Sequence, residues 1–347
     1  MKSILTPKWV TLFAIFLLAI GFYFKQSIGV TIQIGSLLLA LWLAITLHEL
    51  GHVIFGKMSG YQFVFFTTGP LLIEKAKKYF CLKENKHWFH FGGVAMMTPP
   101  NGNNIKKMML YAAGGPILSL IIAMTSFLLY GQYTNSFYLY LGIMNSAIFF
   151  ATIIPVKTNM QTDGYVVLSL LKNNEDTTKL INEINISKEL LSKKQPKDWD
   201  SKQIQLARQM QPSIDHVQYA MFLYYFEIEQ AGFSSAVNAL KDFAAIPVTK
   251  KNKQQLGFII HMKQIEHFLS EDVQLEMISE YQQFLSRIEP LSFHRGEAMI
   301  AYLQDNKTKA LELLHKVQKN VEHNESLYGF FKAEKTLTEL IKEKIAL

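Results

Sequence analysis

The sequence predicts a mainly α-helical protein with a membrane-embedded helical core of about four spans, a small membrane-associated β segment and a C-terminal soluble helical domain. Hydrophobic residues make up 49% of the 347 residues and charged residues only 18%, below the roughly 25% that is usual for soluble domains. The charge is also uneven: residues 1–171 contain 12 basic and 4 acidic side chains, whereas residues 172–347 contain 23 and 24. We therefore expect a membrane domain, 1–171, followed by a soluble domain, 172–347.

Four apolar stretches of the first domain approach or exceed the roughly 20 residues that a membrane-spanning helix needs. They are residues 9–24, 28–55, 108–130 and 137–156. A cleavable signal peptide is the alternative for the first stretch. No small-residue cleavage site follows that stretch, and bulky Phe22, Tyr23 and Phe24 stand at its end, which favours an uncleaved span.

The lysines of the first domain predict its orientation. All except Lys25 lie before the first span, between the second and third spans, or after the fourth. Because positively charged loops stay in the cytoplasm, we expect a multi-pass protein of the cell membrane with residues 57–107 and the C-terminal domain in the cytoplasm. Lysine outnumbers arginine by 32 to 3, which favours an A/T-rich bacterial source.

The cytoplasmic loop contains a segment, about 61–98, that predicts a few short strands. Its aromatic, β-branched and other apolar residues gather in 61–67, 71–73 and 87–97, which Gly69-Pro70 and Gly92-Gly93 separate. Glycine and proline pairs of this kind mark turns. We expect these strands to lie against the membrane face.

The soluble domain predicts pairs of helices. The pairs are 219–230 with 234–244, 258–269 with 273–288, and 293–303 with 308–317. Their first helices start about 36 residues apart, close to the spacing of tetratricopeptide-like repeats. The consensus of those repeats is missing, so an irregular helical bundle is the alternative. The simplest role for such a domain is to recruit a protein partner.

The second span ends with a pattern that predicts metal chemistry, His48-Glu49-Leu50-Gly51-His52. Residues four apart lie on one face of a helix, so both imidazoles can bind one Zn²⁺. Glu49 then stands beside the metal as a general base. An accidental match is the alternative, but ionisable side chains within an apolar span are costly and are functional by default.

A zinc enzyme usually has a third protein ligand and leaves one position for water. Asp163, in Thr162-Asp163-Gly164, is the candidate because it is the only acid between Glu84 and Glu175. An ordinary Asp-Gly turn is the alternative. His87 and His90 are rival ligands, although we expect them to be strand residues.

These motifs resemble the site-2 proteases, a family of intramembrane zinc metalloproteases. The resemblance covers about residues 35–171. Beyond the histidine motif it rests on Gly69-Pro70, Phe91-Gly92-Gly93-Val94, Gly114-Gly115-Pro116, Pro155 and Asp163-Gly164, which occur in the family's order.

The resemblance implies one Zn²⁺ per chain, with His48, His52 and Asp163 as ligands and Glu49 as the catalytic base. The implied activity is that of a zinc metalloendopeptidase that cleaves a single-span membrane protein or a signal-peptide remnant, as in regulated intramembrane proteolysis. A transmembrane substrate must unwind to be cleaved. An open strand edge at 61–67 or 88–94 would hold it in extended form by β-augmentation.

The chain departs from the family pattern near the fourth span. Thr152 stands where the family has an asparagine that helps to stabilise the transition state, and the spacing from Pro155 to Asp163 is longer. Asn145 lies two helical turns before Thr152 on the same face, and Asn159 lies in the longer turn; both are candidates for that role. A hydrogen bond between helices is the alternative for Asn145.

Other classes of protein fit the sequence less well. The single cysteine, Cys81, excludes an internal disulfide or a CxxC site. The excess of basic residues is confined to the apolar domain, so we expect no nucleic-acid partner. A catalytically inactive zinc-binding pseudoprotease or chaperone, which Thr152 favours, and a metal-binding transporter remain as alternatives.

Overall fold

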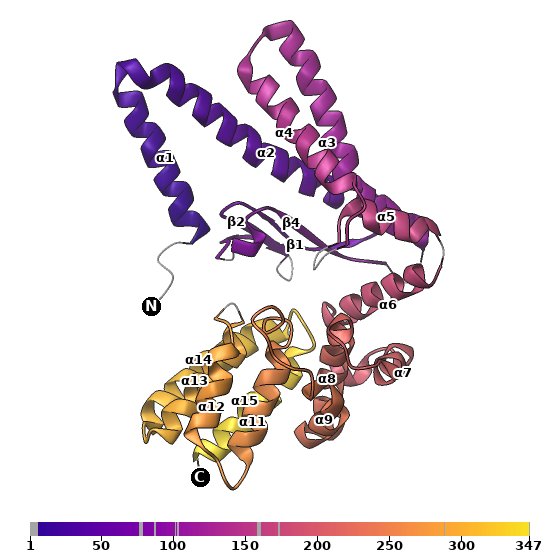
Figure 1. The fold of residues 1–347 in the computed structure, drawn as a ribbon, viewed down its shortest axis with the longest axis vertical. Helices are drawn as coiled ribbons and strands as arrows, with labels where there is room; N and C mark the ends of the chain where they lie inside the picture. Colours follow the sequence, from indigo (N-terminus) through magenta and orange to yellow (C-terminus); the bar gives the residue numbers. More distant parts are fainter. Residues whose placement is uncertain are drawn as a thin grey trace. The chain divides into compact units, whose positions relative to one another are not determined.

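The computed structural model describes residues 6–75, 79–86, 88–100, 102, 104–157, 161–172, 174–287 and 289–346. Over these residues the protein is mainly helical, with fifteen α-helices and one small antiparallel sheet, as the sequence predicts. The chain divides into two compact units, Met1–Ile181 and Asn182–Leu347. The first unit is drawn in indigo to magenta and the second in red to yellow in Figure 1.

The first unit contains four apolar helices. They are α1 (Pro7–Tyr23), α2 (Ile28–Met58), α3 (Ile105–Tyr133) and α4 (Ser136–Ile153). Three helical stretches, Lys25–Met58, Ile105–Tyr133 and Ser136–Ile153, are long and apolar enough to cross a membrane. The first predicted span is an apolar helix of 17 residues, α1, which reaches about 25 Å at 1.5 Å per residue.

Large apolar side chains cover the outside of these helices. Phe13 on α1, Leu128 on α3 and Phe150 on α4 are each at least 60% exposed. Exposed side chains of this kind are unfavourable in water but are suited to the hydrocarbon of a bilayer, where polar groups are excluded. The arrangement supports the membrane assignment of the first unit.

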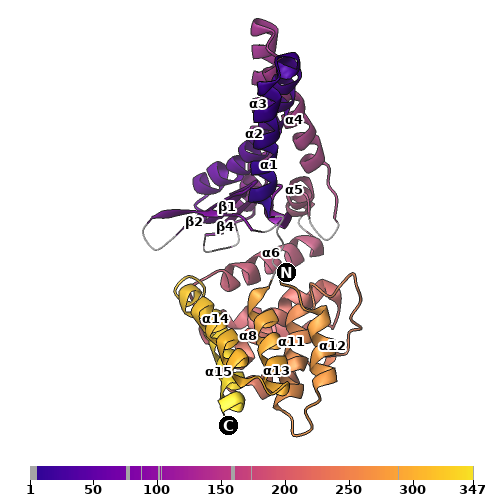
Figure 2. The ribbon, with the colours of Figure 1, turned by 90° about the vertical axis from the view of Figure 1, so that its left-hand side faces the viewer.

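Helices α2, α3 and α4 pack together, with α3 and α4 side by side in both views (Figures 1 and 2). Gly51 of α2 meets Gly114 of α3 so closely that a Cβ atom on either residue would overlap the other's backbone. Small residues permit this approach of two helix backbones. The consequence is that the histidine end of α2 lies against the middle of α3.

A four-stranded antiparallel sheet in the order β3-β2-β1-β4 lies across one end of these helices (Figures 1 and 2). Its strands are β1 (Gln62–Thr68), β2 (Leu71–Lys75), β3 (Phe80–Glu84) and β4 (Val94–Thr98). Tyr61, Phe63, Phe66 and Met97 form its buried core, against which Val53 of α2 and Tyr111 of α3 pack. Among the described residues β4 pairs with β1 alone, so no strand is paired along its outer edge.

The predicted strand 87–97 is wrong in its first half. Residues Trp88–His90 form a 3₁₀ helix, and Gly93 has φ +91°, a conformation that ends the turn before β4 begins at Val94. Strand β3 was not predicted from the sequence. This strand is largely exposed, so it has no alternation of buried and exposed side chains, and its pairing with β2 includes an ion pair between Lys83 and Glu74.

Short helices follow the membrane helices. They are α5 (Asp163–Lys172), α6 (Glu175–Leu190) and α7 (Ser201–Gln209). Helices α8 (Val217–Ala231) and α9 (Phe233–Ala239), α11 (Gly257–Leu269) and α12 (Leu275–Phe284), and α13 (Pro290–Leu303) and α14 (Lys307–Glu325) form the predicted pairs, with α10 (Lys241–Ala244) between the first two pairs and α15 (Phe331–Ala346) at the end.

The second unit is helical because its apolar residues recur at helical spacing and build one large core. The stacking of Trp199 on Phe222, with ring centroids 4.4 Å apart, is part of this core. The predicted helix 234–244 is interrupted at Leu240, which separates α9 from α10. Whether the pairs belong to the tetratricopeptide class stays a prediction.

Candidate metal centre

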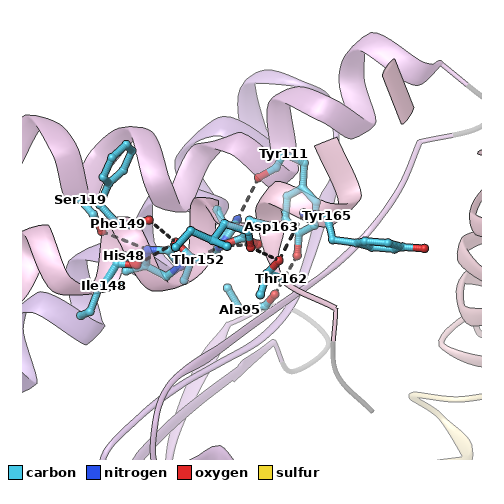
Figure 3. Close-up of polar contacts among 12 residues, drawn as sticks. His48, Ala95, Tyr111, Ser119, Ile148, Phe149, Thr152, Thr162, Asp163 and Tyr165 are labelled. Carbon is cyan, nitrogen blue, oxygen red and sulfur yellow. Dashed lines mark hydrogen bonds and ion pairs between the residues drawn. The ribbon is translucent and has the colours of Figure 1, made fainter. Parts of the chain in front are cut away.

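Three buried or partly buried side chains from distant parts of the sequence meet in the first unit. His48 and His52 lie one turn apart on α2 and are 5% and 7% exposed. Asp163, the first residue of α5, places Oδ2 3.3 Å from Nε2 of His48 and Oδ1 3.4 Å from Nε2 of His52. The three potential ligand atoms lie within 4.8 Å of one another, and Figure 3 shows Asp163 beside His48.

The other ring nitrogen of each histidine is held by α3. Nδ1 of His52 donates to the carbonyl oxygen of Tyr111 at 2.9 Å, and Nδ1 of His48 is 3.0 Å from Oγ of Ser119. Partners of this kind orient a metal-binding imidazole and fix the nitrogen that faces the metal. Both Nε2 atoms therefore face Asp163, as a divalent metal site requires.

Tyr111 and Ser119 were not among the predicted site residues, although the sequence holds a signal for them. Tyr111, Gly115 and Ser119 are spaced by four residues, so they occupy one face of α3. The histidines are also four apart on α2. The face of α3 that carries Tyr111, Gly115 and Ser119 therefore runs along the histidine face of α2. A polar or small residue at every fourth position of an apolar span was the pattern that could have revealed this face.

Gly115 gives the imidazoles their space. A Cβ atom at this position would overlap Nε2 of His52 and would lie 2.7 Å from Cε1 and 2.8 Å from Nε2 of His48. The two Nε2 atoms are the nitrogens that face Asp163. The glycine is therefore required at the metal centre itself, in addition to any role in helix packing.

We expect Gly115→Ala to lose zinc and proteolysis together, because the added methyl group displaces both ligating nitrogens. Zinc content per purified chain and cleavage of a single-span substrate would measure this. Gly131→Ala is the matched control, since it makes the same change on α3 where a Cβ atom meets nothing within 4 Å. Full zinc content and activity in Gly115→Ala would contradict the geometry described above.

A threonine before Asp163 fixes the turn that delivers it. Oγ1 of Thr162 donates to the carbonyl oxygen of Ile154 at 2.8 Å and accepts from the backbone N–H of Val156 at 3.0 Å. It also accepts from the N–H of Tyr165 at 3.3 Å, within the first turn of α5 (Figure 3). Thr162 thus ties the end of α4 to the start of α5.

The environment of Asp163 favours its ionised form. Burial raises the pKa of this carboxyl group, but hydrogen bonding to His48 and His52 outweighs burial and holds the pKa below its usual value. An ionised carboxylate and two oriented imidazoles are a donor set that fits Zn²⁺. The residues present therefore fit the metal that the sequence implies.

Glu49 lies between α2 and the sheet. A Cβ atom on Gly93, just before β4, would stand 2.8 Å from Cγ and 3.3 Å from Oε1 of Glu49. The glutamate side chain thus packs against the backbone of the turn that leads into β4. This contact places the predicted base next to β4, along whose outer edge no described strand is paired.

Two candidates for transition-state stabilisation, Asn145 and Thr152, are on α4, and the rival ligand His90 is in the 3₁₀ helix before β4. Asn145 is fully buried on α4, where Nδ2 donates to the carbonyl oxygen of Leu141 at 2.9 Å. The Thr152 hydroxyl donates to Ile148 at 3.0 Å (Figure 3). Asn159 and His87 lie outside the described residues. His90 packs against Phe65 and is not in the ligand group that the described residues form.

A His-His-Asp ligand group, with both histidines buried on an apolar helix and the glutamate of an HExxH motif beside it, defines the class of membrane metalloproteases. The particular family follows from comparison with known proteins. The chain belongs to peptidase family M50, the site-2 protease family, whose model matches residues 36–317. No curated protein and no solved structure matches the chain.

The family match extends further than the motifs do. It includes most of the second unit, whereas the motif resemblance ends near residue 171. Members of this family are zinc-dependent metalloproteases of membranes. The geometry of His48, His52 and Asp163 agrees with that family property.

Proposed function

We propose that the protein is an intramembrane zinc metalloendopeptidase that hydrolyses a peptide bond in or near a transmembrane segment of its substrate. The single observation that carries this proposal is the meeting of His48, His52 and Asp163 beside Glu49. The substrate would be a single-span membrane protein or a membrane-inserted signal-peptide remnant, as in regulated intramembrane proteolysis.

The residues of the site divide the chemistry among them. His48, His52 and Asp163 would hold Zn²⁺, which supplies a Lewis acid for the scissile carbonyl group and acidifies a water molecule. Glu49 accepts the proton of the attacking water and returns it to the leaving amine. Ser119 and the Tyr111 carbonyl keep the imidazoles in place during both proton transfers.

The edge of β4 that no described strand pairs is the surface that suits an extended substrate, except at Ala95, whose carbonyl oxygen already accepts from Tyr111. Residues 61–67, one of the two predicted docking segments, lie in β1 except for Tyr61, and β1 is paired on both sides. Within the other segment, 88–94, only Val94 is in a strand. The Tyr111 hydroxyl donates to the carbonyl oxygen of Ala95 at 2.8 Å. Tyr111 thus supports both β4 and, through its own carbonyl group, His52.

Comparison of membrane-embedded peptide fragments in cells that carry wild-type protein or Glu49→Gln would test this function. Uncleaved single-span fragments should accumulate with Glu49→Gln and disappear with wild type. Fragments that are identical in the two strains would contradict intramembrane proteolysis.

We further propose that the sheet and the second unit are cytoplasmic, which rests on the lysine distribution. Cys81, on β3 and partly exposed, is the only cysteine and so provides a unique probe. A membrane-impermeant maleimide should leave Cys81 unlabelled in intact cells and label it after the cells are opened. Cys81→Ser provides the background, and labelling in intact cells would reverse the orientation.

A further inference from the structure

The second unit contains a cavity of about 260 Å³ among α8, α11, α13 and α15. These helices are labelled in Figure 2. Tyr224 from α8, His261 from α11, Arg295 from α13 and Glu334 from α15 line the cavity. Its apolar wall includes Met221, Phe258, Leu285 and Leu337. Nothing in the proposed protease mechanism uses these residues.

Arg295 is completely buried and only partly hydrogen-bonded. One terminal nitrogen, Nη2, pairs with the carboxylate and the backbone carbonyl oxygen of Glu334, and Nε donates to the Thr338 hydroxyl at 3.2 Å. The other terminal nitrogen, Nη1, is buried and has no hydrogen-bond partner among the described residues. Because a buried donor without an acceptor is destabilising, Nη1 points to an acceptor that the described residues do not supply.

His261, which is 2% exposed, offers an acceptor to the same cavity. Nε2 of Gln264 donates to Gln282 and to the Ile278 carbonyl oxygen, so Oε1 of Gln264 must accept from Nδ1 of His261, 3.0 Å away. Burial and then the nearby charge of Arg295 lower the pKa of His261 to about 3. The ring is therefore neutral, and its unpartnered Nε2 carries a lone pair.

The Tyr224 hydroxyl is the third buried group of the lining that finds no hydrogen-bond partner in the described part of the chain. The neighbouring Tyr225 hydroxyl, by contrast, donates to Glu334 at 2.6 Å. Arg295 and Tyr224 thus offer donors, and His261 offers an acceptor. A ligand that satisfies all three must carry an acceptor and a donor on an otherwise apolar body.

The charges around the cavity favour a neutral ligand. The positive charge of Arg295 is already paired with the carboxylate of Glu334. Glu289, which also lines the cavity, uses its carboxylate oxygens to accept from the N–H groups of Leu291 and Ser292. Lys253, the remaining charged residue of the lining, is exposed to solvent. An anionic ligand therefore finds no unpaired positive charge, and a cation finds only the Glu289 carboxylate, whose oxygens already accept two hydrogen bonds.

We propose that this cavity binds a small neutral amide, whose carbonyl oxygen accepts from Arg295 and Tyr224 and whose N–H group donates to His261. A primary or secondary amide places an acceptor and a donor on adjacent atoms, and an apolar substituent would contact Phe258 and Leu337. The site is independent of the metal centre and would make the second unit a ligand-binding domain.

N-acetyl-L-leucinamide, a neutral molecule with two amide groups and an apolar side chain, is a suitable probe. Its binding to the purified full chain in detergent would be measured by saturation-transfer NMR and equilibrium dialysis. N-acetyl-L-leucine, an anion, and L-leucinamide, a cation, are the matched charged probes. We expect the neutral amide to bind more tightly than either charged analogue.

Tyr224→Phe should weaken binding of the neutral amide by about three- to tenfold, the effect of one hydrogen bond, since it removes only the unpartnered hydroxyl group. Tyr219→Phe is the matched control, because Tyr219 is on the same helix but does not line the cavity. No binding of the neutral amide, equal binding by the Tyr224→Phe chain, or stronger binding of a charged analogue would overturn the proposal and assign the cavity to water.

Discussion

Glu49→Gln is expected to keep its zinc and its fold but to lose peptide cleavage by about 10²–10⁴ in rate, the usual contribution of a general base. Glutamine is nearly isosteric with glutamate, so the contact with Gly93 is preserved. His48, His52 and Asp163 are unchanged, so the metal stays bound. Glutamine cannot accept the proton of the attacking water, and a small residual rate from the metal alone is compatible with the mechanism.

Zinc content by elemental analysis and cleavage of a purified single-span substrate would be measured on the same preparation. Glu74→Gln is the matched control, because Glu74 is on β2 and pairs with Lys83 rather than with the metal ligands. That variant should retain the full rate. Wild-type function in Glu49→Gln but not in His48→Ala would show that zinc is structural, which is the pseudoprotease alternative that Thr152 favours.

Asp163→Ala is expected to bind zinc far more weakly than wild type, with loss of cleavage as a result. The change removes the only anionic ligand and leaves two neutral imidazoles. Loss of a residue that merely orients a ligand costs about 10–100-fold in metal affinity, so loss of the ligand itself should exceed this. Zinc affinity would be measured by competition with a chelator of known affinity.

Asp176→Ala, in the first turn of α6, is the control for removal of an acid from a nearby helix terminus. It should bind zinc normally. Stoichiometric, undiminished zinc in Asp163→Ala would mean that Asp163 belongs to an ordinary turn. The third ligand would then be sought at His90, or at His87 outside the described residues.

Local sequence accounts for much of the candidate site. The four-residue spacing of His48 and His52 places both imidazoles on one face of α2 by helix geometry alone. Asp163 could be predicted because it is the only acid in a long stretch of the chain. The role of Gly115 could not be predicted, because it depends on α3 crossing α2 at the imidazoles.

The fold, like the site, was predicted where it depends on local sequence and missed where it depends on contacts between distant segments. Long apolar runs and helical periodicity are local properties, so the sequence predicted the apolar helices and the helical second unit. Strand β3 was missed and the strand at 87–97 was placed too early, because strand boundaries depend on pairing with distant segments. The edge of β4 that no described strand pairs is likewise a property of strand order, which pairing alone decides.

By itself the sequence determined the composition of the two domains, the histidine face and the acid that can meet it, because each follows from charge, hydrophobicity or helix period. Only the tertiary structure decided which residues orient the imidazoles and which backbone Glu49 contacts. Only it brought Tyr224, His261 and Arg295, from three different helices, to one cavity. The physical reason is that side-chain packing between distant segments selects these contacts, and no local periodicity records them.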